Sequence, residues 1–160
     1  MRKGQFGRKD RMIQERRHGL YRHREKWPEP TICEHCSALF EKGRWTWSQT
    51  DQEAYTTVCP ACRRIAGNHP AGYVEIRGNF FNEHREELIN LIMNVEAQQK
   101  AERPLERLMQ VVDREGRTVV TTTGIHIARR IGDSLSNAYQ GNLDIQYADG
   151  DKRVRVYWER

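Results

Sequence analysis

The sequence has no long apolar run and no cysteine outside two close pairs. Its longest apolar-rich stretch covers residues 88–93, far short of the roughly 18 apolar residues that a membrane-spanning helix requires. The first thirty residues contain no apolar segment of the kind found in secretion signals, so the pair Arg16-Arg17 does not make a twin-arginine export signal. We therefore expect a cytoplasmic protein that does not enter the membrane.

Residues that would form a catalytic site are also missing. The six histidines are scattered from position 18 to position 126, without a neighbouring nucleophile or the spacing of a metalloprotease. Gly78 stands alone after a predicted strand, so there is no glycine-rich loop that would cradle a phosphate. Residues 121–124 can place backbone N–H groups at a helix start, where a phosphate binds, but a strand end followed by a helix cap is the simpler interpretation. We expect no enzymatic activity.

The four cysteines form two Cys-x-x-Cys pairs, Cys33 with Cys36 and Cys59 with Cys62. In each pair a tight turn directs both sulfurs to one point, and four thiolates complete the tetrahedral shell of a zinc ion. A catalytic zinc would keep one position open, so the predicted ion is structural. The segment between the pairs, residues 37–58, is long enough for a β-hairpin. These features predict a zinc ribbon that binds one structural Zn²⁺.

Other interpretations of the cysteines stay open at this point. Iron uses the same four ligands, and two such pairs also fit a redox switch that forms disulfides when its metal is lost. A disulfide scaffold is less favoured, because nothing upstream resembles a secretion signal and a reducing compartment keeps thiols free. His35 lies inside the first pair and is either a fifth candidate ligand or, more simply, an exposed turn residue.

The excess positive charge is confined to the N-terminus. Residues 1–30 contain ten Lys or Arg and four acidic residues, a net +6, whereas the other 130 residues carry 17 basic and 18 acidic ones, a net −1. Few aliphatic residues occur here, which predicts an arm that is disordered in the free protein. Aromatic residues among arginines favour RNA binding over a merely solubilising tail. The predicted RNA contacts are Arg2, Lys3, Arg8, Lys9, Arg11, Arg16, Arg17, Arg22, Arg24 and Lys26 in the arm, and Arg44, Trp45, Arg63 and Arg64 in the ribbon.

Apolar residues concentrate after Gly72, where alternating and helical patterns predict an α+β domain. Its sheet is expected to be antiparallel or mixed, with two helices on one face. A helical continuation through residues 105–112 competes with the strand predicted there. The arginines Arg153, Arg155 and Arg160 alternate with apolar residues, so they belong to the opposite face, as RNA contacts or as solvated groups. The expected elements are strand 73–77, a helix from Asn79 or Asn82 to about residue 100, strands 108–113 and 118–123, a helix from Thr122 or Thr123 to the cap at Gly141, and strands 143–147 and 154–158.

Together these patterns divide the chain into a basic RNA-binding arm (1–30), whose last residues, 27–30, form an extended linker, a zinc ribbon (31–66) and an α+β domain (72–160). A connector rich in glycine and proline, residues 66–72, is predicted between the last two.

The order of these motifs resembles a known family pattern. The four-cysteine ribbon is followed by the segment 72–77, a helix, and a threonine-rich strand that leads to residues 128–132. This order resembles the N-terminal part of the archaeal and eukaryotic export adaptor of the large ribosomal subunit. It resembles more closely an uncharacterised bacterial family of short zinc-ribbon proteins that share the Cys-Pro-x-Cys pair and a tail like residues 154–160. The sequence lacks the later domains and export tail of the adaptors, so export is not implied.

The resemblance implies a protein that binds the ribosome or structured RNA, with only the four cysteines carried over as metal ligands. We therefore predict a non-enzymatic, ribosome-associated protein that binds rRNA. It would act in hibernation, translation control or assembly, by occupying the subunit interface or the tRNA path. The alternatives are a zinc-ribbon protein of DNA or transcription, and a module for protein–protein interaction.

Overall fold

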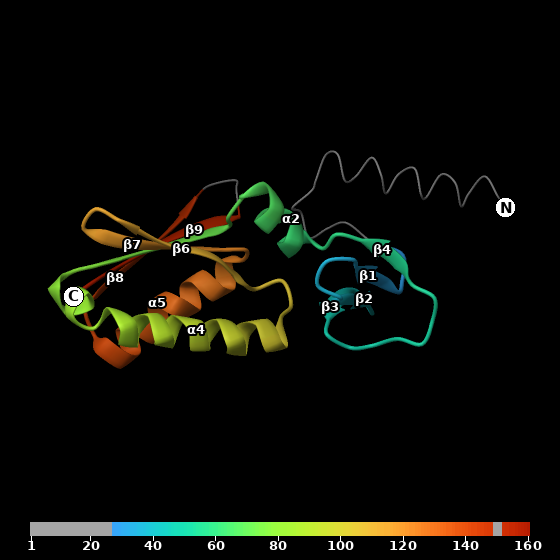
Figure 1. Cartoon of the computed structure of the whole chain (residues 1–160), viewed down its shortest axis with the longest axis horizontal. Helices are drawn as coiled ribbons and strands as arrows, with labels where there is room; N and C mark the ends of the chain where they lie inside the picture. The colour runs from blue at the N-terminus through green and yellow to red at the C-terminus, as the bar shows by residue number, and fades with distance from the viewer. Residues whose placement is uncertain (1–26, 149–151) are drawn as a thin grey trace. The chain divides into compact units, whose positions relative to one another are not determined.

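The computed structural model describes residues 27–148 and 152–160 (Figure 1). The chain divides into two compact units, residues 1–64 and 65–160, which we describe separately. The ten RNA contacts predicted in the arm lie outside the described residues. Within the described ranges, none of the helices has the length and apolar character needed to cross a membrane.

The first unit contains a small four-stranded sheet. Its strands are β1 (Thr31–Cys33), β2 (Leu39–Glu41), β3 (Arg44–Thr46) and β4 (Tyr55–Thr57), in the order β3-β2-β1-β4. The hairpin expected between the cysteine pairs is confirmed, because β2 and β3 are antiparallel neighbours. Lys42 and Gly43 join them with φ angles of 52° and 78°, the conformation of a tight hairpin turn. Strand β4 then returns parallel to β1.

Three aromatic rings form the core of this small sheet. Trp27 lies edge-on to Phe40 and to Trp45, with ring centroids 5.1 and 5.3 Å apart, and all three side chains are buried. The hydroxyl of Thr31 donates to the carbonyl of Pro28, which ties the preceding segment to β1. Trp27 therefore belongs to the core of the ribbon rather than to a linker, and residues 28–30 connect it to β1.

Helix α2 (Pro60–Gly67) follows β4 and was not expected from the sequence. A turn-rich connector was predicted from residue 66, but the helix continues through Gly67. Pro60 occupies its first position, where the missing N–H costs no hydrogen bond. The backbone N–H of Arg63 donates to the carbonyl of Cys59 over 3.0 Å and closes the first turn. The second cysteine pair therefore lies at the start of a helix.

The second unit contains a five-stranded mixed sheet. Its strands are β5 (Gly72–Arg77), β6 (Leu108–Arg114), β7 (Arg117–Thr122), β8 (Asn142–Ala148) and β9 (Arg153–Glu159), in the order β6-β7-β5-β9-β8. Strands β5 and β9 are parallel, and the other neighbours are antiparallel. The predicted succession of strands and helices is confirmed. The helical alternative for residues 105–112 is wrong, because most of that segment belongs to β6.

The helices α3 (Asn79–Glu83), α4 (Arg85–Glu102) and α5 (Ile125–Tyr139) complete this unit. Figure 1 shows α4 and α5 on the same side of the sheet, as predicted. Alternate residues of the central strands face these helices and form one apolar core, which leaves the other sheet face without a helix. The buried core residues are Val74, Ile76, Phe81, Leu88, Ile92, Val95, Val120, Ile127, Ala128, Ile131, Leu135, Val154, Val156 and Trp158.

Helix ends differ from the predicted ones. The residues that precede α3, α4 and α5 are Gly78, His84 and Gly124, and none of them caps its helix with its own side chain, so the predicted Asn and Thr caps are wrong. Instead, the carboxylate of Glu106 accepts a hydrogen bond of 2.8 Å from the backbone N–H of Ile127 in the first turn of α5. This side chain fills the place that a phosphate would need. The stop near Gly141 is confirmed, since this residue has a φ of 85°.

Candidate metal centre

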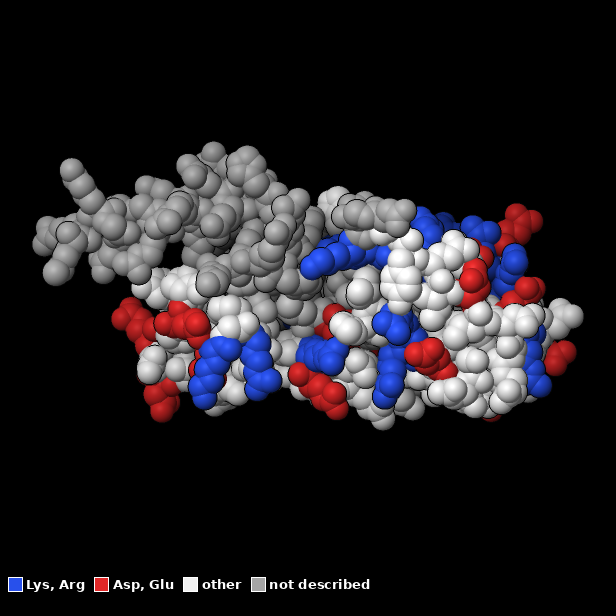
Figure 2. Space-filling model, turned by 180° about the vertical axis from the view of Figure 1, so that it is seen from behind, with Lys and Arg blue, Asp and Glu red and all other residues white. Residues whose placement is uncertain are grey.

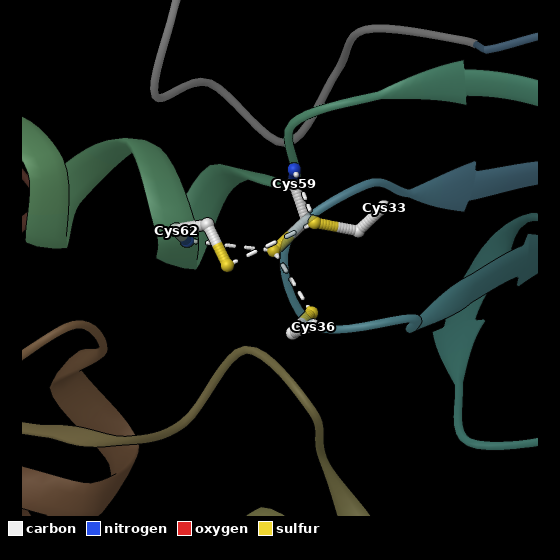
Figure 3. A group of neighbouring side chains, drawn as sticks. All are labelled: Cys33, Cys36, Cys59 and Cys62. Atoms are coloured by element: carbon white, nitrogen blue, oxygen red, sulfur yellow. Dashed lines mark hydrogen bonds between the residues drawn. The ribbon is translucent and has the colours of Figure 1, made fainter.

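The four cysteines meet at one point in the first unit. Cys33 ends β1, Cys36 follows in the next turn, Cys59 precedes α2 and Cys62 lies in its first turn. Figure 3 shows their four sulfur atoms converging from these separate elements. All four lie within 4.8 Å of one another. Two segments that are more than twenty residues apart in sequence thus supply two ligands each.

The sulfur separations fit a tetrahedral metal ion. Cys33 Sγ lies 3.8 Å from Cys62 Sγ, and Cys36 Sγ lies 3.8 Å from Cys59 Sγ. Each of these distances joins one sulfur of the first Cys-x-x-Cys pair to one sulfur of the second. A tetrahedron with edges of this length has its centre about 2.3 Å from each corner, which is the usual Zn–S distance. The arrangement therefore accommodates a metal ion bound by four thiolates.

Backbone N–H groups surround the sulfurs and orient them. The N–H groups of His35 and Cys59 point to Cys33 Sγ at 3.4 and 3.3 Å, and the N–H of Cys62 points to Cys59 Sγ at 3.4 Å. Such contacts favour the thiolate form, which is the form that binds a metal. The turns of the two cysteine pairs therefore both direct the ligands and stabilise their negative charge.

The two buried thiols, Cys33 and Cys59, also shift each other's pKa. A side-chain hydrogen bond with Cys59 lowers the pKa of Cys33 to about 3, against an opposing effect of burial. That contact, together with burial, raises the pKa of Cys59. The two thiols therefore do not ionise independently. A bound cation would supply the charge that lets all four sulfurs ionise.

The shell contains sulfur ligands alone. The group of metal-binding side chains found in the described part of the chain is limited to the four cysteines, of which Cys33 and Cys59 are buried and the other two partly exposed. His35 is exposed and belongs to the turn, as the simpler interpretation had it. Four thiolates leave no open position, so the geometry suits a structural ion better than a catalytic one.

Not all of the RNA contacts predicted in the ribbon are accessible. Arg44 is exposed on β3, and Arg63 and Arg64 lie half-buried on α2 beside Cys62. The guanidinium of Arg63 donates to the hydroxyl of Thr57 over 3.2 Å. Trp45, in contrast, is only 9% exposed and packs against the rings described above. Its ring is largely covered, which does not favour the RNA contact predicted at Trp45.

The role of Trp27 in the ribbon core was missed from the sequence. Its position among arginines and prolines suggested an arm residue, and no alternation around it indicated burial. The available signal was the pairing of Trp45 with an apolar residue on the neighbouring strand, because a small sheet is stable only when another group packs against its apolar face.

Comparison of the chain with models of protein families, with curated proteins and with solved structures found no match to any of them.

Proposed function

We propose that this protein is a non-enzymatic, zinc-stabilised protein that binds the ribosome through rRNA. The observation that carries the proposal is the closed four-sulfur centre, which fixes a small module that follows, in the sequence, an N-terminal arm with a net charge of +6. A closed centre supports a structural role for the metal. Zinc is the proposed ion, because its preferred distance and tetrahedral geometry fit the sulfur spacing.

The charge distribution supports a polyanionic partner. The arm carries all of the excess positive charge, and Arg44, Arg63 and Arg64 add basic groups to the ribbon. Lysines and arginines that neutralise phosphates release condensed counterions, which favours binding and makes it depend strongly on salt. In this proposal the arm contacts the rRNA backbone, and the ribbon holds the C-terminal end of the arm at a defined point on the ribosome.

The family resemblance supports the ribosome as the source of the RNA. It points to a surface near the junction of the subunits, where a bound protein would block the tRNA path in resting cells or assist assembly. This role would place the protein in the cytoplasm. Hibernation, translation control and assembly all require the same first event, which is stable association with a ribosomal subunit.

Sedimentation of the full-length protein with ribosomes over a range of salt concentrations tests this proposal. Replacing Arg16 and Arg17 by Gln should reduce the slope of log K against log salt by about 1.4 to 1.8, because each phosphate contact contributes about 0.7 to 0.9. The matched control replaces the adjacent pair Arg129 and Arg130 on α5, which are exposed, and should leave the slope unchanged.

Three results would contradict the proposal. A wild-type protein that stays in the supernatant at low salt would refute ribosome binding. Equal salt slopes for the arm variant and the α5 variant would refute the role of the arm. Tighter binding to duplex DNA than to rRNA at equal ionic strength would favour the alternative of a transcription-associated zinc ribbon.

A further inference from the structure

The face of the five-stranded sheet that lies opposite α4 and α5 carries an ordered row of aromatic and basic side chains. Tyr73 on β5 is the register partner of Arg155 on β9, and Glu75 is the partner of Tyr157. Because side chains alternate between the two faces of a strand, these four residues share one face, while Val74 and Val156 point into the core. We call this surface the open face.

Tyrosine and arginine side chains on the open face are positioned by contacts with one another. The guanidinium carbon of Arg155 lies over the Tyr73 ring, 4.6 Å from its centroid. Tyr73 and Tyr157 are partly exposed. A hollow of about 210 Å³ lies between them, and Arg117 and Val119 complete its wall. Aromatic and guanidinium planes are thus held at a surface that solvent reaches.

A second hollow on the same face adjoins the first. It has a volume of about 350 Å³ and extends toward β8, where Asn142 and Gln146 line it. Tyr157 lines both hollows. A flat ring between two polar recesses is the arrangement that a single strand of RNA uses, since one base stacks on the ring and neighbouring base edges meet amide groups.

The charges of the open face also favour an anionic partner. Glu75 pairs with Arg117 at 3.0 Å, and Glu159 pairs with Arg77 at 3.7 Å. These pairs neutralise two acidic groups of the face. A third, Asp144, lies opposite Tyr157 and accepts a hydrogen bond of 2.9 Å from the side-chain amide of Gln146, whereas Arg155 lies over a ring. Figure 2 shows basic side chains along the upper margin of this unit, the sheet side, with acidic ones interspersed.

An apolar protein partner fits this face less well. The large apolar side chains exposed in the described residues are Tyr55, Ile65, Met93, Val111 and Tyr147, and none of them lies on the open face. Tyr147 and Val111 pair in register with the core residues Val154 and Val120, which places both on the helix side. The core of a protein interface is more apolar than the rest of the surface, although Tyr and Arg are common in it. None of the exposed large apolar side chains supplies such a core on this face.

We propose that the open face binds single-stranded RNA, with bases stacked on Tyr157 and Tyr73 and a phosphate on Arg155. This inference rests on the proposed function and adds a second contact site to it, separate from the arm. The arm would supply the salt-dependent part of the affinity, whereas stacking would supply a part that salt does not screen.

The sheet provides its own matched control. Tyr147 on β8 is 55% exposed, and Arg129 of α5 lies over its ring at 5.9 Å. An arginine–tyrosine pair therefore exists on each face of the same sheet. Tyr73→Val and Tyr157→Val test the open face, Tyr147→Val tests the helix side, and valine keeps a side chain that strands favour. Arg155→Gln is compared in the same way with Arg129→Gln.

Binding is measured with the full-length, zinc-loaded protein and a short oligouridine that carries a photoreactive 4-thiouridine. At high salt, where the contribution of the arm is screened, Tyr157→Val should weaken binding by about 5- to 100-fold, the range seen for lost base stacking. Tyr147→Val should bind like the wild type. Crosslinked peptides should contain residues of β5 and β9, and the near-ultraviolet signal of the buried Trp158 reports whether each variant is folded.

Equal affinities of the folded variants on the two faces, or crosslinks confined to residues 1–26, would overturn this inference. Sedimentation with ribosomes would then still stand as evidence for the proposed function. A wild-type protein that shows the face-specific stacking effect but does not sediment with ribosomes would refute the proposed function and leave the RNA site on the open face intact.

Discussion

Removing the metal should unfold the ribbon and leave the second unit folded. The described part of the first unit, residues 27–64, has strands of only three residues each and one small aromatic core. Domains of fewer than about 40 residues rarely fold without a metal or disulfides. Structural zinc supplies about 10 to 16 kcal/mol in zinc-finger peptides near pH 7, which exceeds the stability that this small core can provide.

The second unit does not depend on the four cysteines. Its core joins fourteen buried residues from three helices and three strands, and no sulfur ligand belongs to it. A chelator should therefore separate the two units in a single sample. The expected outcome is loss of structure in residues 27–64 alone, because the sulfur cluster is the contact that joins β1 to α2.

Tryptophan emission gives a direct assay for this prediction. Three of the four tryptophans lie in the ribbon, at positions 27, 45 and 47, and Trp158 lies in the second unit. Chelation under a strong thiol reductant, which prevents disulfides between released thiols, should shift the emission of the ribbon indoles toward that of exposed tryptophan. Amide spectra should show collapsed ribbon signals beside unchanged signals of α4 and α5.

The refuting result is clear in this design. If elemental analysis shows the metal removed while the emission and the amide spectrum stay the same, the aromatic core holds the ribbon by itself and the metal is not structural. In the metal-loaded protein, X-ray absorption should give four sulfur neighbours at about 2.3 Å and no nitrogen. A nitrogen neighbour would contradict the closed shell of four cysteines.

Two further predictions concern the second unit. A Cβ at Gly124 would lie 1.8 Å from a carboxylate oxygen of Glu106. Gly124→Ala should therefore expel the carboxylate that caps α5 and lower the free energy of unfolding, measured by urea titration, by about 2 kcal/mol. An unchanged unfolding midpoint would contradict this prediction. Hydrogen bonds from Thr118 and, to a smaller extent, Arg85 lower the pKa of the Asp113 carboxyl. The small contribution of this carboxylate to stability is therefore present above its unfolded pKa and is lost as the pH falls through its lower folded pKa. Thr118→Val should raise the Asp113 pKa in a carbon-13 NMR titration, and an equal pKa in both proteins would show that the hydroxyl has no effect.

Local patterns in the sequence predicted the strands well. The alternation in residues 143–147 and 154–158 identified β8 and β9 to within about two residues, because one face of each strand is buried. The parallel pairing of β9 with β5 was not predictable in the same way. It joins Tyr73 to Arg155 across most of the unit, and no short-range pattern specifies which distant strand becomes a neighbour.

Helix starts were the weakest predictions, and Glu106 shows why. Thr122 and Thr123 precede α5 and have the chemistry of caps, yet the first turn receives its hydrogen bond from a carboxylate some twenty residues earlier in the chain. The hydroxyl of Thr123 instead donates to the carbonyl of Leu105. Thr123 is thus used to hold the loop before β6, and the hydroxyl of Thr122 donates to the carbonyl of Gly124, so neither threonine caps α5.

The metal centre was predictable because its ligands are specified locally. Each Cys-x-x-Cys pair fixes two sulfurs within one turn, and only the meeting of the two pairs depends on the fold. The surroundings of the centre were less predictable, since the local sequence around Trp45 is the same whether its ring is exposed to a base or buried in a core. Burial of a large ring depends on what covers it, and here the cover is Trp27, from a segment that reads as polar.

An affinity site and a specificity site have opposite requirements, and the RNA contacts proposed for the arm and for the open face would separate them. A flexible cationic segment binds any polyphosphate, and salt weakens it in proportion to the contacts that it makes. Stacking on an aromatic ring needs a rigid support, because a ring that moves by about 1 Å loses its favourable alignment with the base. The open face has that support: Tyr157 sits between the buried residues Val156 and Trp158 on a strand that is hydrogen-bonded on both sides. The near-neutral charge of the second unit is then an advantage, since a strongly basic sheet would bind RNA wherever phosphates occur and would lose the discrimination that stacking provides.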